Sequence, residues 1–430
     1  MNWWFTYRKK NILCYLHKIN KTGGVFLLLS KISFYGTTLI LIVLILVLSL
    51  KFNKKTEEKI NDEVSNEYIA SYFDGEYQTE IPGKDDGYVV DKIVCDNGTT
   101  ADWDNEEWGI NIRNATQKIK CGVYFKKLVK LAEQIATLAS TDTTNFATDD
   151  PDSNIRYIGA KPNNYVYFNC SDYSNQNDST CEKWRIIGLF NNVVKSDNSK
   201  DNLVKIISLN AFSLSFDADS SYQSTSNYST STLKEILNNN YYNSDSTKIP
   251  IYGMSGGEDQ ERTISFGNSG IKNDNTRNII ENVVWNLGGI SSSNNSVVSF
   301  YNAERSSTIF SGTSPTWTGK IGLPYPSDYG YATADGSSNR QNCLNENLSD
   351  VFKNDCGSNN FFLKDQIISN SLTLTPSSSG YIYYFGYNTY FFGGIPTMLY
   401  SSAHPTLYLK SSVTILSGDG SSTNPYQLNI

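Results

Sequence analysis

The segment Trp184-Arg185-Ile186-Ile187-Gly188-Leu189-Phe190 is a short, mostly apolar run. A second run of the same kind follows at Leu203-Val204-Lys205-Ile206-Ile207-Ser208-Leu209. Polar residues separate the two runs, and this pattern is typical of short buried strands. We therefore expect two strands here, with Trp184 packed in a core rather than exposed to a ligand.

Residues 155–430 continue this pattern and form the largest unit that we expect. Short strands such as Tyr165-Val166-Tyr167-Phe168 alternate with Ser-, Asn- and Gly-rich loops, which are longest at 213–231, 253–275 and 306–316. Long loops on a strand scaffold either bind a ligand or are solvated insertions. The pattern predicts a domain of short strands joined by long irregular loops.

A smaller unit is expected before it, at residues 66–125. Partial alternation of apolar and polar residues predicts a small antiparallel β-sheet module there. The period then becomes helical, because Leu128, Leu131, Ile135 and Leu138 fall on one helix face. A stretch rich in Ser, Thr, Asp and Asn follows, so residues 126–154 are interpreted as a helical connector and linker.

The N-terminal part of the chain predicts a membrane anchor. Residues 32–50 carry no charge, and a helix of that length spans about 28 Å, close to the roughly 30 Å hydrocarbon core of a bilayer. Residues 1–31 are basic and residues 51–65 are charged and poor in apolar residues, which suits a stalk. The excess of flanking cations before the span favours a cytoplasmic N-terminus and an extracellular bulk in a single-pass protein. A cleaved signal peptide is the alternative, although no small-residue cleavage site follows the run.

Charge is divided unevenly along the chain. The first 55 residues hold nine Lys or Arg and no acidic residue, whereas the remainder holds 27 basic and 43 acidic residues. An acidic ectodomain disfavours nucleic acid as a partner, because phosphate binding needs a basic surface. With two His in the whole chain, His-rich zinc sites and a Ser-His-Asp triad are also disfavoured.

The cysteines support the same topology. Cys14 precedes the predicted span, and an even set follows it: Cys95, Cys121, Cys170, Cys181, Cys343 and Cys356. Pairing between sequence neighbours, Cys95–Cys121, Cys170–Cys181 and Cys343–Cys356, is the simplest of fifteen arrangements. Free thiols in an anaerobe are the alternative. A zinc cluster is less favoured, since the chain has no Cys-x-x-Cys.

Several short sequence phrases of residues 155–430 carry a resemblance to a known family. They are RYIGA at 156–160 with PNNYV at 162–166, WRIIG at 184–188, WNLGG at 285–289, WTGKIGL at 317–323, YPSDYGYAT at 325–333, and LYLK at 407–410 with GDG at 418–420 and NPY at 424–426. In these phrases residues 155–430 resemble an uncharacterised extracytoplasmic domain family of low-GC Gram-positive gut bacteria. The resemblance implies a fold similar to the C-type-lectin-like fold shared with formylglycine-generating enzymes, which is an α+β fold with a mixed core and long irregular loops. It supplies no catalytic residues.

The chain departs from the family in two places. The family's Trp-Thr-Leu-Ser-Pro phrase is replaced by Leu372-Thr373-Leu374-Thr375-Pro376, and its Arg-Pro pair by His404-Pro405. If those positions belong to a structural core or a site, this chain is altered there.

A cluster of aromatic residues near the C-terminus is the candidate binding site. Tyrosine combines a large contact area with a hydrogen-bonding tip, which suits recognition surfaces. We single out as ligand-binding residues Trp317, Tyr383, Tyr384, Tyr387, Asn388 and Tyr390. The alternative is that these rings only pack an aromatic hairpin.

No cofactor or metal is predicted. Asp150, Asp152 and Asn154 match the first three ligand positions of an EF-hand loop, but Ile155 and Lys161 stand where that loop needs Gly and Glu. The sequence therefore predicts a non-catalytic, membrane-anchored surface protein that recognises an extracellular protein or glycan. A structural cell-envelope component is the first alternative. An oxidative enzyme of the formylglycine-generating type, using Cys343 and Cys356, is the second.

Overall fold

The structure is a computed structural model, and it describes residues 67–73, 75–113, 118–217, 225–251, 260–290, 296–307, 314–335, 339–348, 355–365, 370–378, 380–385, 391–396 and 399–430. The predicted cytoplasmic segment 1–31, span 32–50 and stalk 51–65 lie outside these residues. Among the residues described, no helix combines the length and the apolar character that a bilayer crossing requires. The chain divides into two compact units, Met1–Lys126 and Lys127–Ile430.

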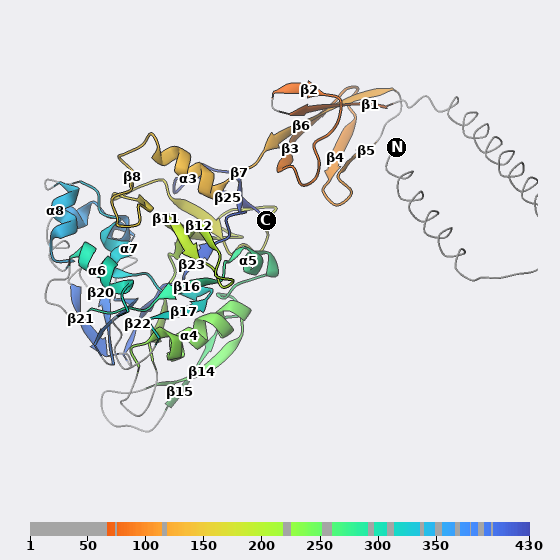
Figure 1. Cartoon of the computed structure of the whole chain (residues 1–430). Helices are drawn as coiled ribbons and strands as arrows, with labels where there is room; N and C mark the ends of the chain where they lie inside the picture. The colour runs from red at the N-terminus through yellow and green to blue at the C-terminus, as the bar shows by residue number, and fades with distance from the viewer. Residues whose placement is uncertain are drawn as a thin grey trace, which may run out of the picture. The chain divides into compact units, whose positions relative to one another are not determined.

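The smaller unit is a β-sheet backed by a hairpin (Figure 1). Its sheet has the order β2-β1-β6-β3, and the hairpin pairs β4 with β5. The strand bounds are β1 Glu67–Phe73, β2 Glu76–Gln78, β3 Tyr88–Cys95, β4 Thr100–Asp104, β5 Gly109–Arg113 and β6 Ile119–Lys127. The expected antiparallel sheet is in fact mixed, because β1 runs parallel to β6. Parallel neighbours need a crossover connection, and the intervening strands β2 to β5 provide it.

One face of this small sheet forms a core. The side chains of β6 alternate, so Val123 and Phe125 point inward and pack with Tyr88 against the aromatic rings of the hairpin. The predicted Cys95–Cys121 disulfide joins β3 to β6 beside that core. A closed loop of this kind compensates for the small amount of apolar surface that so short a unit buries.

The larger unit is built around one main sheet with the order β18-β23-β12-β11-β9-β8, and β10 pairs with β11 beside it. The bounds are β8 Phe146–Ala147, β9 Ile155–Tyr157, β10 Tyr165–Phe168, β11 Glu182–Val194, β12 Lys200–Ser208, β18 Ile321–Gly322 and β23 Thr406–Leu409. The two apolar runs at 184–190 and 203–209 belong to the central strands β11 and β12. They pair antiparallel along nearly their whole length.

Smaller sheets and short helices surround the main sheet. A second sheet has the order β13-β22-β19-β20-β21, and its bounds are β13 Phe212–Ser215, β19 Ser371–Ser378, β20 Tyr381–Phe385, β21 Phe391–Pro396 and β22 Tyr400–Ala403. The remaining strands are β7 Val129–Lys130, β14 Ser246–Ile251, β15 Gln260–Ser265, β16 Val283–Asn286, β17 Thr316–Gly319, β24 Thr414–Ser417 and β25 Gln427–Asn429. This arrangement agrees with the predicted α+β class.

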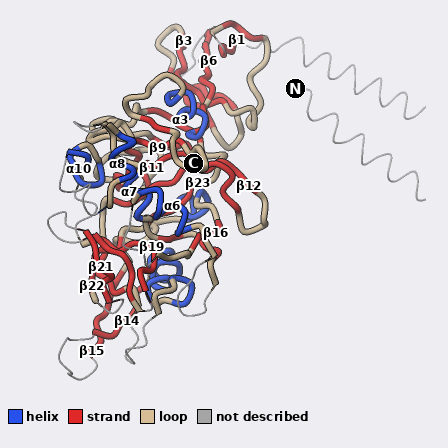
Figure 2. The backbone as a smooth tube through the Cα atoms, turned by 60° about the vertical axis from the view of Figure 1, so that its left-hand side comes forward, coloured by secondary structure: helices blue, strands red, loops and turns tan. Residues whose placement is uncertain are grey.

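The helices are short, and α6, α7 and α8 gather on one side of β11, β12 and β23 (Figure 2). Their bounds are α3 Leu131–Ala139, α4 Thr232–Glu235, α5 Asp274–Ile279, α6 Val297–Glu304, α7 Pro326–Gly330, α8 Arg340–Asn345, α10 Asp355–Ser358 and α11 Phe361–Lys364, with a 3₁₀ turn η1 at Tyr228–Thr230 and a π-helical turn η2 at Ile236–Tyr241. The predicted connector helix is α3. Its residues Leu131 and Ile135 are buried in the core of the larger unit.

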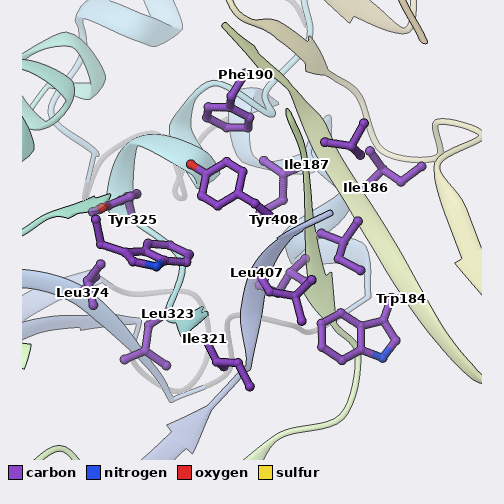
Figure 3. Close-up of a cluster of buried hydrophobic side chains, with 14 of the residues drawn as sticks. Trp184, Ile186, Ile187, Phe190, Ile321, Leu323, Tyr325, Leu374, Leu407 and Tyr408 are labelled. Carbon is purple, nitrogen blue, oxygen red and sulfur yellow. The ribbon is translucent and has the colours of Figure 1, made fainter. Parts of the chain in front are cut away.

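The core of the larger unit follows β11, β12 and β23 (Figure 3). Trp184 is fully buried in it, as predicted, and its indole N–H donates to Glu182. The other two predicted disulfides, Cys170–Cys181 and Cys343–Cys356, are also formed. The neighbour pairing inferred from the sequence therefore agrees with the structure at all six cysteines.

Candidate functional site

A row of residues across the main sheet underlies the candidate site. The strand register places Arg156 of β9 opposite Gly188 of β11, Gly188 opposite Lys205 of β12, and Lys205 opposite Tyr408 of β23. Directly paired residues lie on the same face of a sheet, so both cations point to one side. Gly188 is required, because a Cβ there would lie 2.2 Å from the carbonyl oxygen of Ile155. The sheet thus carries two long cations on one buried face.

Asp328 of α7 accepts from both of these cations. Its carboxylate lies 2.9 Å from Arg156 Nη1 and 2.5 Å from Lys205 Nζ, and it also accepts from the backbone N–H of Tyr325. All three charged side chains are almost completely buried. Burial alone would raise the pKa of Asp328, but Lys205 and Arg156 outweigh it and lower that pKa. Burial lowers the pKa of Lys205 to about 8, so the ion pair is charged at neutral pH.

A second acidic group lies at the end of α6. The Glu304 carboxylate is fully buried and accepts from the backbone N–H and the hydroxyl of Ser327. Burial raises the pKa of Glu304 to about 7, against the opposing effect of the Arg305 guanidinium. Arg305 stacks on the Tyr301 ring at 3.4 Å and donates through Nη1 to Glu304. Its guanidinium is therefore held in one orientation.

The acidic loop that resembles part of an EF-hand is ordered by an arginine. The Asp150 carboxylate accepts from the backbone N–H groups of Asp152 and Asn154, and it lies 2.8 Å from Arg156 Nε. Asp152 instead points outward, where it accepts from the Tyr301 hydroxyl. The protein itself thus supplies the positive charge that the loop needs.

A bulge in β11 directs polar side chains toward the same place. The register of β11 against β12 shifts between Phe190 and Val193, so Asn191 and Asn192 stand outside the regular ladder. Asn192 adopts the left-handed conformation, which asparagine tolerates better than most residues. Bulges of this kind re-aim side chains and are frequent beside functional sites. Here Phe190 stays on the inner face and Asn192 is exposed at the rim.

These elements enclose a cavity of about 130 Å³ in the larger unit. Its floor consists of aromatic rings from four elements or their flanking loops: Phe190, Trp285, Tyr325 and Tyr408. Figure 3 labels three of these residues, Phe190, Tyr325 and Tyr408, near one another. The Lys205 ammonium lies beneath them, between 4.4 and 5.5 Å from each ring centroid. The floor is therefore both aromatic and fixed by a buried cation.

The rim of the cavity offers unused hydrogen-bonding groups. Within the described part of the chain, no hydrogen bond is formed by Arg305 Nη2, by Asp152 Oδ1 or by the side-chain amides of Asn192 and Asn286. The Asn286 backbone, in contrast, is bonded on both sides to the Tyr325 hydroxyl, so its position is set. Donors and acceptors around an aromatic floor are the usual construction of a small-molecule site.

Among the residues predicted to bind a ligand, those that the structure describes, Trp317, Tyr383 and Tyr384, do not line this cavity. Trp317 of β17 is partly buried, lies across Gly319 and packs edge-on against Tyr228. Tyr383 is buried, and its hydroxyl donates to the carbonyl oxygen of Ile290. The structure leaves Tyr384 half-buried. The other three predicted residues, Tyr387, Asn388 and Tyr390, lie outside the described residues.

None of the cavity residues was predicted to bind a ligand, but the sequence contains a signal for them. Arg156, Trp285, Asn286, Tyr325 and Tyr408 each belong to a phrase on which the family resemblance was based. These phrases are far apart in the sequence and meet at this cavity and the charges beneath it. Comparisons with family models, with curated proteins and with solved structures found no match, so the site is interpreted from its own geometry.

Proposed function

We propose that this chain is a single-pass, membrane-anchored surface protein that recognises an external partner through the cavity of its larger unit. The cavity carries the proposal. It combines an aromatic floor, a buried ion network that fixes the floor, and rim groups with hydrogen-bonding capacity that the described residues do not use. Leaving such groups open is costly inside a protein unless solvent or a ligand satisfies them.

The proposed location is supported from two sides. Residues 32–50 have the length and composition of a membrane span, and the flanking cations favour a cytoplasmic N-terminus. The disulfides all follow that span, and disulfides persist in oxidising compartments outside the cytosol. A C-type-lectin-like fold for residues 155–430 belongs to the same proposal, supported by the mixture of small sheets and long loops.

A non-catalytic role is part of the proposal. Cys343 and Cys356, the pair that an oxidative enzyme would use, are joined and almost completely buried. His404 is also buried, with its Nδ1–H donating to the carbonyl oxygen of Ser208. Neither arrangement offers an exposed reactive group, which supports binding over catalysis.

Two measurements test the proposal. Intact cells that express the full chain are treated with trypsin, and the region past residue 60 is expected to be cut without lysis. The full chain, purified in detergent micelles, is then applied to an array of immobilised glycans, polypeptides and cell-wall fragments. We expect at least one class of spot to bind.

The pocket is tested with Asn286→Leu, which keeps a similar volume but removes the donor and the acceptor. Asn278→Leu, the same substitution on the exposed side of α5, is the matched control. Binding should fall at least tenfold for the first variant and stay unchanged for the second. Protection of the ectodomain until lysis, or array binding that ignores Asn286→Leu, would refute the proposal.

A further inference from the structure

We infer that the occupant of the cavity is the terminal unit of a neutral glycan, bound through adjacent hydroxyl groups without calcium. This inference rests on the proposed function and specifies its ligand. The size of the cavity, the balance of charge at its rim and the chemistry of its open groups support this inference.

The cavity is small. Its volume is about 130 Å³. Pockets for drug-sized ligands are about 300 Å³ or larger. The cavity therefore accommodates the end of a chain rather than an internal stretch of polymer.

The charges at the rim are balanced. Asp152 Oδ2 lies 3.5 Å from Arg305 Nε, so one anion and one cation face each other at the mouth. The deeper cations, Arg156 and Lys205, are already paired with carboxylates, and Glu304 lies against Arg305. A ligand with a net charge would approach one like charge and gain little from the other. The rim thus favours a neutral ligand.

The open groups supply donors and acceptors in alternation. Arg305 Nη2 is a donor, Asp152 Oδ1 is an acceptor, and the amides of Asn192 and Asn286 are both. An alcohol needs both kinds of partner, because each hydroxyl donates one hydrogen bond and accepts others. Neighbouring hydroxyls on a sugar ring match this set.

Calcium has no part in this arrangement. Asp150, the best-placed carboxylate for a cation in the nearby loop, is already bonded to the Arg156 guanidinium and to two backbone N–H groups. Binding is therefore expected to survive a chelator. This separates the site from one in which a metal ion holds the sugar hydroxyls.

The test uses the full chain in detergent micelles with methyl glycosides of glucose, galactose and mannose, and with methyl glucuronide as the charged analogue. Binding is measured by saturation-transfer NMR and by competition on the array. We expect at least one neutral glycoside to bind, to bind at least fivefold more tightly than the glucuronide, and to be unaffected by EDTA.

The variants assign the interaction to the rim. Asn286→Leu and, independently, Asn286→Ala should weaken the neutral glycoside at least tenfold, with thermal melting as the check on folding and Asn278→Leu and Asn278→Ala as the matched controls. Asp152→Asn should reduce the difference in affinity between the neutral glycoside and the glucuronide, because it removes the negative charge that repels the glucuronide. Tighter binding of the glucuronide to the unmodified chain, or loss of binding with EDTA, would overturn the inference.

The two proposals fail in different ways. If Asn286→Leu weakens array binding but none of the three neutral glycosides binds, the cavity is a recognition site and the neutral-glycan inference is wrong. If the pocket variants leave array binding unchanged, the proposed function itself is wrong.

Discussion

Glu304 and His404 are expected to give the larger unit two pH dependences of opposite sign. Both side chains are buried, and burial is the main cause of each shift. It raises the pKa of Glu304 from 4.5 to about 7 and lowers the pKa of His404 from 6.5 to about 4. The two groups therefore make the folding stability depend on pH over nearly the same pH range, but in opposite directions.

The signs follow from which state holds the proton. Between about pH 4.5 and 7 the folded chain keeps the Glu304 proton that the unfolded chain has lost, so stability falls as pH rises. Between about pH 4 and 6.5 the unfolded chain binds a proton at His404 that the folded chain does not, so stability falls as pH drops. Each effect amounts to roughly 3 kcal/mol over its full range at 1.36 kcal/mol per pKa unit.

The perturbations are Glu304→Gln and His404→Gln, each of which removes one titration and keeps a hydrogen-bonding side chain. From about pH 5 to about pH 6.5 each group changes the stability by roughly 2 kcal/mol, and the two changes nearly cancel in the unmodified chain. As the pH rises over this interval, the stability of Glu304→Gln should increase by about 2 kcal/mol relative to that of the unmodified chain. His404→Gln should lose about the same amount.

The assay is urea unfolding of the full chain, followed by tryptophan fluorescence at several pH values, because Trp184 and Trp285 are buried in the larger unit. The comparison uses differences between each variant and the unmodified chain, which removes the contribution of all other titrating groups. Parallel pH profiles for the two variants would refute this prediction, because pKa shifts in opposite directions require mirror-image profiles.

Three further outcomes are expected. Lys205→Met should cost about 3–5 kcal/mol, measured as a lower urea midpoint with unchanged slope, because it leaves Asp328 buried with one cation fewer; an effect below about 1 kcal/mol would contradict the ion-pair assignment. Replacing Cys95 and Cys121 together by Ser should destabilise the smaller unit by about 3 kcal/mol, seen as faster proteolysis there with the larger unit unchanged. Gly188→Ala should lower the melting temperature of the larger unit by several degrees, since the added carbon would lie 2.2 Å from a backbone oxygen of β9; an unchanged melting temperature would show that β9 can move away.

Local patterns were sufficient to predict much of the fold. The apolar runs of β11 and β12 identify themselves by composition, and the burial of Trp184 follows from its neighbours. The disulfides pair cysteines that are close in the sequence, so the assumption that neighbouring cysteines pair predicted them correctly. The parallel pairing of β1 with β6 was missed, because strand direction depends on contacts between segments far apart in the chain.

The candidate site was missed for the same reason. Arg156 and Asp328 are 172 residues apart, and Lys205 and Asp328 are 123 apart, so no local spacing predicts that they meet. Composition drew attention instead to the late tyrosines, of which Tyr383 is buried. A dense run of aromatic residues indicates that a segment has apolar surface available. Whether a given ring is buried depends on the residues that pack against it from other parts of the chain.

The buried ion network has a positional role that its energy alone does not explain. Burying Lys205 and Asp328 removes two charges from water, and pairs of this kind often stabilise a fold no more than an apolar substitute would. The carboxylate of Asp328, however, also accepts from the backbone N–H of Tyr325, and the Tyr325 hydroxyl is bonded to both sides of the Asn286 backbone. One chain of contacts therefore runs from the cations of the sheet, through α7, to the rim amide of the cavity. An apolar replacement of similar volume could fill the core, but it would remove the contact that links Asp328 to the Tyr325 backbone and, through the Tyr325 hydroxyl, to the Asn286 backbone.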